Sequence, residues 1–201
     1  MDSQEPTEAF AARWTLLHGL FFDAAQEERA WEKAVSALTE TSRGTFTAVL
    51  WDGGNVPRAS IEDAVARCGG VLVEVRAGAD GLYDGEDRLW ERGRLRDVME
   101  AADLGITGAA WAVAHTGTVA LYGDARRGMW PSLLPPAHLI ALRREDIMPG
   151  LAAGLERLAS ESPLPPEVKL VSGPSSTADI EGQLVVGVHG PGRVAVVVSS
   201  W

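Results

Sequence analysis

The C-terminal stretch Leu170–Trp201, LVSGPSSTADIEGQLVVGVHGPGRVAVVVSSW, predicts the fold of the whole chain. It closes with a continuous apolar, mostly β-branched run, Val194–Val198, which is typical of a strand that is covered on both faces of a parallel sheet. Two bends rich in glycine and proline precede this strand, Gly173–Thr177 and His189–Gly190. We expect both bends to meet at one end of the sheet and to form a pocket there.

The segment between the two bends is predicted to be a short helix, because four apolar residues share one face of a 3.6-residue period: Ile180, Leu184, Val185 and Val188. Ser176 or Thr177 would cap the start of this helix, and Asp179 would lie in its first turn, where acidic groups suit the helix dipole. A hydroxyl-rich turn that leads from a strand into a helix N-terminus favours anions, so we expect a small-anion site here.

Further upstream, the pattern indicates a β-α-β unit. Phe46–Trp51 and Val71–Val75 are apolar strand patterns, and Ser60 can cap the helix between them. Two strands joined by a helix in so short a stretch indicate a parallel sheet. We therefore predict a single α/β domain over residues 43–201, with a mainly parallel sheet flanked by helices, and an α-helical extension over residues 1–42, broken near Gly19–Asp23.

The block from Leu104 to Tyr122 is crowded with small residues. Gly105–Ala114 has no wide polar face, which predicts a buried helix or a tightly packed loop close to backbone or ligand. Val119–Tyr122 and His138–Leu142 are predicted strands. We expect His138, at the start of the second of these strands, to contact solvent.

Composition narrows the classes of partner. The formal net charge of −10 argues against nucleic acid or anionic membranes as the main partner, and no apolar stretch is long enough to span a bilayer. The N-terminal residues resemble no export signal, so a cytoplasmic location is expected. Cys68 is the only cysteine, which excludes an intrachain disulfide or a cysteine-ligated iron–sulfur cluster in this chain, and a small buried side chain is its simplest role.

Two histidines lie at glycine-flanked turns, His115 and His189, where a side chain can face a cleft. Either could cap a turn, or act as a general acid or base, or donate a hydrogen bond to phosphate or carboxylate. Neither has metal-ligand spacing, so no metal site is predicted. The Gly173–Thr177 bend lacks both the lysine of a phosphate-binding P-loop and a dinucleotide fingerprint. Several arginines cluster near these turns in the sequence: Arg126, Arg127, Arg143, Arg144 and Arg193.

These segments resemble the LUD domain family over roughly Phe46 to the C-terminus. The resemblance is carried by Gly105–Gly108, Ala114–Thr118, Leu134–His138, Ser172–Glu181 and Gly187–Pro191. It implies a fold related to sugar-phosphate isomerases, CoA transferases and 5-formyltetrahydrofolate cyclo-ligase. It also implies a role in oxidising L-lactate to pyruvate, with two companion proteins that carry iron–sulfur clusters. Many relatives have glutamate where this chain has His115, which puts carboxylate chemistry at that position in doubt.

Lactate oxidation needs a redox cofactor, and this sequence shows no flavin, nicotinamide or iron–sulfur motif, so any cofactor is unknown. We therefore expect a non-redox subunit with a small-anion site, whose predicted residues are Gly105, Thr107, Thr116, Gly117, Thr118, Gly173, Ser175, Ser176, Thr177, His189 and Gly190. Candidate catalytic residues are His115, His189 and Asp179. Two alternatives stay open: a stand-alone enzyme acting on a phosphorylated, CoA-linked or folate metabolite, and a regulatory module that senses lactate or a nucleotide. The oligomeric state is left open.

Overall fold

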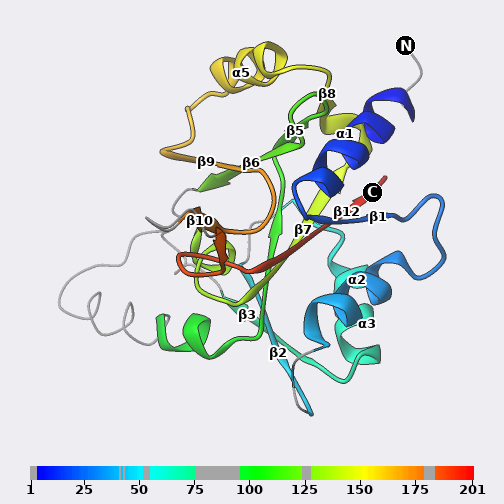
Figure 1. The fold of residues 1–201 in the computed structure, drawn as a ribbon, viewed down its shortest axis with the longest axis vertical. Coiled ribbons are helices and arrows are strands. Elements are labelled where there is room, and N and C mark those ends of the chain that lie inside the picture. The colour runs from blue at the N-terminus through cyan, green and yellow to red at the C-terminus, as the bar shows by residue number, and fades with distance from the viewer. Residues whose placement is uncertain are drawn as a thin grey trace.

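The computed structural model describes residues 4–40, 42, 44–51, 55–75, 96–123, 128–178 and 184–201. Within these residues, a six-stranded parallel sheet forms the centre of the molecule, in the order β1-β12-β7-β4-β2-β3 (Figure 1). Its strands are β1 (Leu20–Asp23), β2 (Thr47–Trp51), β3 (Val71–Val75), β4 (Leu104–Gly108), β7 (Ala137–Arg143) and β12 (Arg193–Ser199). The predicted α/β fold with a mainly parallel sheet is confirmed.

A second, mixed sheet packs on one face of the central sheet. It has the order β8-β5-β6-β9 and consists of β8 (Ile147–Met148), β5 (Trp111–Val113), β6 (Thr118–Gly123) and β9 (Glu167–Val171). Helix α1 (Gln4–Leu16) packs on the same face of the central sheet, and α5 (Leu151–Ser160) packs on the far side of the second sheet, where Gly154 contacts Trp111. Helices α2 (Ala30–Thr39) and α3 (Arg58–Arg67) cover the opposite face of the central sheet (Figure 1).

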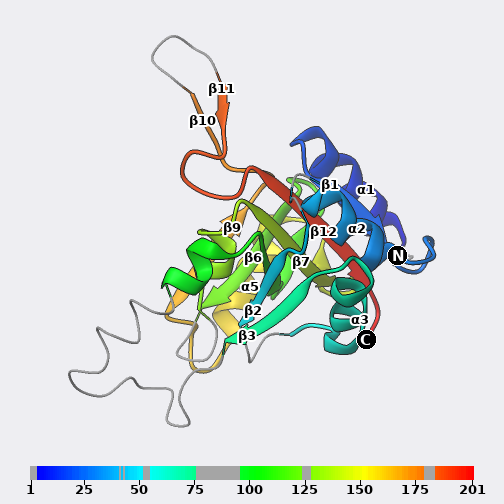
Figure 2. The same cartoon turned by 90° about the horizontal axis from the view of Figure 1, so that it is seen from below.

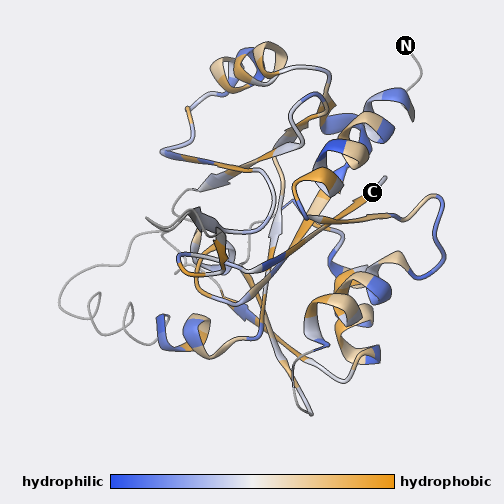
Figure 3. Ribbon diagram, viewed as in Figure 1, coloured by the Kyte–Doolittle hydropathy of each residue, from blue (hydrophilic) through white to orange (hydrophobic). Residues whose placement is uncertain are grey.

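The central sheet is buried on both faces, which explains its apolar strands. Alternate residues of β12 enter two different cores: Ala195 and Val197 pack toward α2 and α3, whereas Val194, Val196 and Val198 pack toward α1 and the second sheet. The ribbon of the central strands is accordingly coloured as hydrophobic along most of its length (Figure 3). This burial confirms the predicted strand Val194–Val198.

The described part of the segment predicted as a helix between the two bends contains a strand instead. Strand β10 (Ser176–Ala178) pairs antiparallel with β11 (Leu184–Val186), and these two strands project from the body of the molecule (Figure 2). Gly187 has a φ of +83°, which a helix does not accept. The helix prediction is wrong because Val185 and Val188 lie exposed, so a helix here would not bury its apolar face in a core. In addition, β-branched residues favour a strand. Ile180–Gln183 lie outside the described residues.

Two other local predictions need correction. The small-residue block Gly105–Ala114 contains strands β4 and β5 rather than a helix or loop, and its glycines let other backbone segments approach closely, Pro131 at Gly105 and Asn55 at Gly108. The N-terminal extension is not wholly helical: at the predicted break, β1 pairs in parallel with β12 and so joins the central sheet. The β-α-β unit formed by β2, α3 and β3 is confirmed. Among the described residues, no helix has the length and apolar character needed to cross a bilayer.

Candidate functional site

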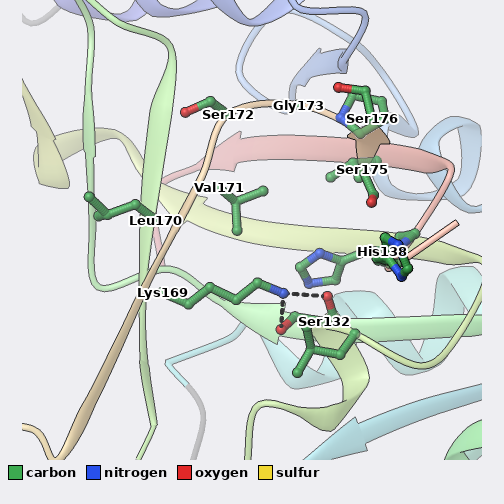
Figure 4. A pocket seen from close by; sticks show the side chains of 15 residues that line it. Ser132, His138, Lys169, Leu170, Val171, Ser172, Gly173, Ser175 and Ser176 are labelled. Carbon is green, nitrogen blue, oxygen red and sulfur yellow. Dashed lines mark hydrogen bonds between the residues drawn. The ribbon is translucent and has the colours of Figure 1, made fainter. Parts of the chain in front are cut away.

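A cavity of about 320 Å³ lies between the two sheets, beside the first residues of β7 and β12. Both sequence-predicted bends line it, through Gly173 and Ser175 of the first and His189 and Gly190 of the second. Ser176, the first residue of β10, also lines it. The remaining polar wall comes from Ser132, His138, Lys169 and Ser172 (Figure 4). The structure therefore brings the two bends to one pocket at one end of the central sheet.

Backbone hydrogen bonds fix the two bends to each other. The Ser175 amide donates to the Pro191 carbonyl at 2.9 Å, and the Gly187 amide donates to the Ser175 carbonyl at 2.8 Å. Gly190 faces the Ser175 side chain so closely that a Cβ at Gly190 would lie 3.4 Å from Ser175 Oγ. This part of the pocket wall therefore has a defined geometry even though it is made of bends.

Lys169 places its amino group inside the pocket. Strand β9 pairs Lys169 with Leu121, whose side chain is 1% exposed, whereas the neighbouring Leu170 points outward and is 50% exposed. The Lys169 Nζ donates to the Ser132 carbonyl at 2.7 Å and lies 3.2 Å from the Ser132 Oγ. Burial lowers the pKa of Lys169 from 10.5 to about 8, and the nearby charge of Glu167 acts in the opposite direction.

His138 is buried beside this lysine and does not contact solvent as the sequence suggested. Its side chain is 1% exposed, and its Nε2 lies 2.8 Å from Thr107 Oγ1 on the neighbouring strand β4. Burial, assisted by the charge of Lys169, lowers the pKa of His138 to about 3. The imidazole is therefore neutral at neutral pH. The predicted residue Thr107 contributes to the site through this histidine.

Gly105, also predicted from the sequence, acts through packing. A side chain there would overlap the Pro131 carbonyl oxygen, because the short turn η1 (Trp130–Ser132) lies directly on β4. This contact holds Ser132 beneath Lys169, and the Ser132 hydroxyl is anchored by donating to the Met129 carbonyl at 2.7 Å. Gly105 is thus a packing position that determines where the partner of Lys169 lies.

Other predicted residues lie away from the cavity lining. Thr116, Gly117 and Thr118 form the β5–β6 turn, where Thr118 hydrogen-bonds both Thr116 and Ser172 and Gly117 packs against α1. Thr177 and His115 are exposed and do not line the cavity. Asp179 lies outside the described residues. The turn Thr116–Thr118 therefore supports the first bend from behind, through Ser172.

Of the five arginines that cluster in the sequence, the three that the structure describes, Arg143, Arg144 and Arg193, do not line this pocket. Arg143 ends β7 and Arg144 follows it, at the opposite end of the strand from the pocket, where they pair with Asp146 and Asp23 respectively. Arg193 begins β12, and Arg126 and Arg127 lie outside the described residues.

Cys68 is half-buried beside the Glu32 carbonyl, and burial raises the pKa of its thiol, which disfavours the reactive thiolate. Within the described ranges, no cluster of metal-ligating side chains is present.

Sequence reasoning did not select four polar residues that line the pocket: Ser132, His138, Lys169 and Ser172. One signal was available for Lys169. The chain contains eighteen basic residues other than histidine, and only two of them, Lys33 and Lys169, are lysines. The scarcity of lysine is a signal that the sequence contains, and the structure adds a lowered pKa in a cavity, which is a feature of functional sites. The pocket therefore offers one ammonium group, hydroxyl donors and a neutral imidazole, which together suit a small anion.

Comparison with known proteins assigns the chain to a family. The LUD domain model matches residues 60–199. The chain is 43% identical to lactate utilization protein C 1 of Bacillus mycoides, over 97% of this chain and 87% of that protein. It is 30% identical to lactate utilization protein C of an Exiguobacterium species, over 80% of this chain and 77% of the relative. Other relatives match over about half of their length, for example 47% in Halalkalibacterium halodurans.

A solved structure shows the same fold. The crystal structure of a DUF162 family protein from Deinococcus radiodurans matches with a TM-score of 0.64 at 19% identity, and the match covers 98% of both chains. The family model covers the part of the chain from α3 to the end of β12, which includes every described residue that lines the pocket. On this evidence the chain belongs to the LUD domain family.

Proposed function

We propose that this protein is a subunit of an L-lactate utilisation system and that its pocket binds a small anion of that system. The relatives named lactate utilization protein C support the pathway. The observation that carries the ligand proposal is the convergence of both bends on a cavity that contains the Lys169 ammonium group. A half-buried cation of this kind is stabilised by an anionic partner.

The chemistry of the reaction indicates which steps this subunit carries out and which steps its partner proteins carry out. Oxidation of L-lactate to pyruvate removes two electrons, and ordinary side chains do not carry them. This chain supplies one cysteine, whereas iron–sulfur clusters are held by several thiolates. In this proposal the electrons pass to iron–sulfur partner proteins, and this subunit holds the small anion.

Growth on L-lactate tests the pathway. We expect a host strain that lacks this gene to lose growth on L-lactate while growing normally on glucose, and to recover when the gene is returned. We expect the tagged protein to co-purify with proteins that contain iron–sulfur clusters. Normal growth of the deletion strain on L-lactate, in a host without a second copy, would overturn the proposal. Turnover of a phosphorylated, CoA-linked or folate metabolite by the isolated chain would instead favour a stand-alone enzyme.

A further inference from the structure

We propose that the pocket is selective for a small monocarboxylate with a hydroxyl or keto oxygen at its second carbon, and that Lys169 is the charged group that binds its carboxylate. This inference rests on the proposed small-anion site and specifies its ligand class. It follows from three features of the pocket: the number of charges in its described wall, the position of its uncharged polar groups and its size.

The charge of the described wall favours a monoanion. Lys169 is the only lysine or arginine among the described residues that line the cavity. His138 is neutral at neutral pH, because its pKa is lowered to about 3. A carboxylate neutralises one ammonium group, whereas a phosphate ester carries up to two negative charges and would leave an excess charge in a partly buried site. The wall therefore suits a carboxylate better than a phosphate.

The uncharged groups favour a second oxygen on the ligand. In Figure 4 the amino group of Lys169, the ring of His138 and the side chain of Ser175 turn toward the same space. Thr107 hydrogen-bonds Nε2 of the imidazole, so among the described residues Nδ1 is the ring nitrogen that has no hydrogen-bond partner. A neutral imidazole nitrogen and a serine hydroxyl can each hydrogen-bond a hydroxyl or a keto oxygen. An acid with a hydroxyl or keto oxygen next to its carboxylate would bind Lys169 through the carboxylate and His138 or Ser175 through that second oxygen.

The cavity size agrees with a compact ligand. Its volume of about 320 Å³ lies at the small end of ligand pockets. The amino group of Lys169 is already held by two oxygen atoms of Ser132, at 2.7 and 3.2 Å. These oxygens fix the position of the charge before a ligand arrives, which lowers the entropic cost of binding.

The two lysines of the chain allow a direct test on the unmodified protein. Labelling with ¹³C-lysine yields one side-chain Cε signal from Lys169 and one from Lys33, which is exposed and pairs with Glu27. The pH titration of each signal reports the pKa of its own amino group. We expect pyruvate and L-lactate to raise the pKa of Lys169 and to leave that of Lys33 unchanged, because a bound carboxylate favours the charged form. Acetate and inorganic phosphate serve as comparison ligands.

Calorimetry with matched variants completes the test. We expect Lys169→Met to weaken pyruvate or L-lactate binding by on the order of tenfold or more, because a hydrogen bond to a charged group is lost. Lys33→Met is the matched control and should bind as the parent does. The inference is overturned if phosphate binds more tightly than both hydroxy and keto acids, if acetate binds equally well, or if Lys169→Met keeps its affinity. Loss of growth on L-lactate in the deletion strain, together with full affinity in Lys169→Met, would overturn this inference alone and leave the proposed pathway standing.

Discussion

The imidazole of His138 and the hydroxyl of Thr107 meet across two adjacent parallel strands, with Nε2 and Oγ1 2.8 Å apart. His138 is 1% exposed, so this hydrogen bond lies in the wall between the central sheet and the pocket. The contact holds the ring of a histidine that has almost no access to water. Because burial penalises the charged imidazolium, the folded protein keeps this histidine neutral.

The first prediction concerns stability in acid. The pKa of His138 is about 3 in the folded protein, compared with 6.5 ordinarily, so the unfolded state binds more protons between these values. Stability should therefore fall as the pH drops through this window, by at most about 1.4 kcal/mol per pH unit from this one group. We expect His138→Gln to flatten the fall in urea midpoint between roughly pH 6 and pH 4. The exposed His115→Gln is the control, and an equal slope in both variants would contradict the prediction.

The second prediction concerns Lys169. Its pKa is about 8 in the folded protein, compared with 10.5 ordinarily, so folding disfavours its charged form. The resulting penalty is fully present below pH 8 and disappears as the pH rises through 10.5, where the unfolded state also becomes neutral. We expect Lys169→Met to be more stable than the parent at neutral pH, with the difference shrinking toward high pH. The measurement is the urea midpoint across this range, with Lys33→Met as control. A variant that is less stable at neutral pH would be inconsistent with a penalised lysine.

The third prediction concerns Gly105. An alanine there would overlap the Pro131 carbonyl and push η1 away from β4. We expect Gly105→Ala to lower the free energy of unfolding by about 1–3 kcal/mol or more, and to weaken ligand binding by moving Ser132. Gly150→Ala is the matched control, since nothing lies within 4 Å of its added Cβ. Chemical denaturation of both variants provides the comparison, and equal costs would show that η1 is not packed as described.

The fourth prediction concerns the carboxylate of Asp146, which is buried at the opposite end of β7 from the pocket. It accepts from Arg143 at 2.8 Å and pairs with Arg157 at 2.9 Å, and its side chain is 2% exposed. Removing it leaves two guanidinium groups without this partner, so we expect Asp146→Ala to cost about 3 kcal/mol of stability. Asp63→Ala breaks the exposed pair with Arg67 and should cost under about 1 kcal/mol. Similar unfolding free energies for the two variants would refute this difference.

The fifth prediction separates the two candidate histidines. Both are exposed, yet His189 lines the pocket and His115 lies on the β5–β6 turn outside it. We expect His189→Ala to weaken anion binding by roughly tenfold, the equivalent of one hydrogen bond, and His115→Ala to leave binding unchanged. Isothermal calorimetry with pyruvate or L-lactate measures both. If His115→Ala were the variant that lost affinity, the site would lie elsewhere on the protein.

Local sequence patterns correctly predicted the strands, the β-α-β unit and the bends whose conformation depends on nearby residues alone. The run Val194–Val198 is a buried strand because a β-branched apolar segment has no stable place outside a two-sided core. The β-α-β unit follows from two apolar strand patterns with a helix between them. The glycine-rich bends also lie together, as predicted from their positions before and after strands.

The same reasoning misassigned the segment from Ile180 to Val188 because spacing alone does not show whether a core is available. Val185 and Val188 remain exposed, and the described part of the segment contains strand β11, which pairs with β10. The described wall of the pocket therefore contains no helix N-terminus of the predicted kind. The lysine that lines it is Lys169, which the sequence prediction did not select.

The sequence alone therefore determined the α/β class, the buried parallel strands and the two bends, since these follow from periodicity, β-branching and the backbone freedom of glycine. Only the tertiary structure decided that Lys169 points inward while Leu170 points outward, and that His138 is buried against Thr107. The physical reason is strand register: which face of β9 meets the core depends on its pairing with β6, through contacts that no local pattern contains.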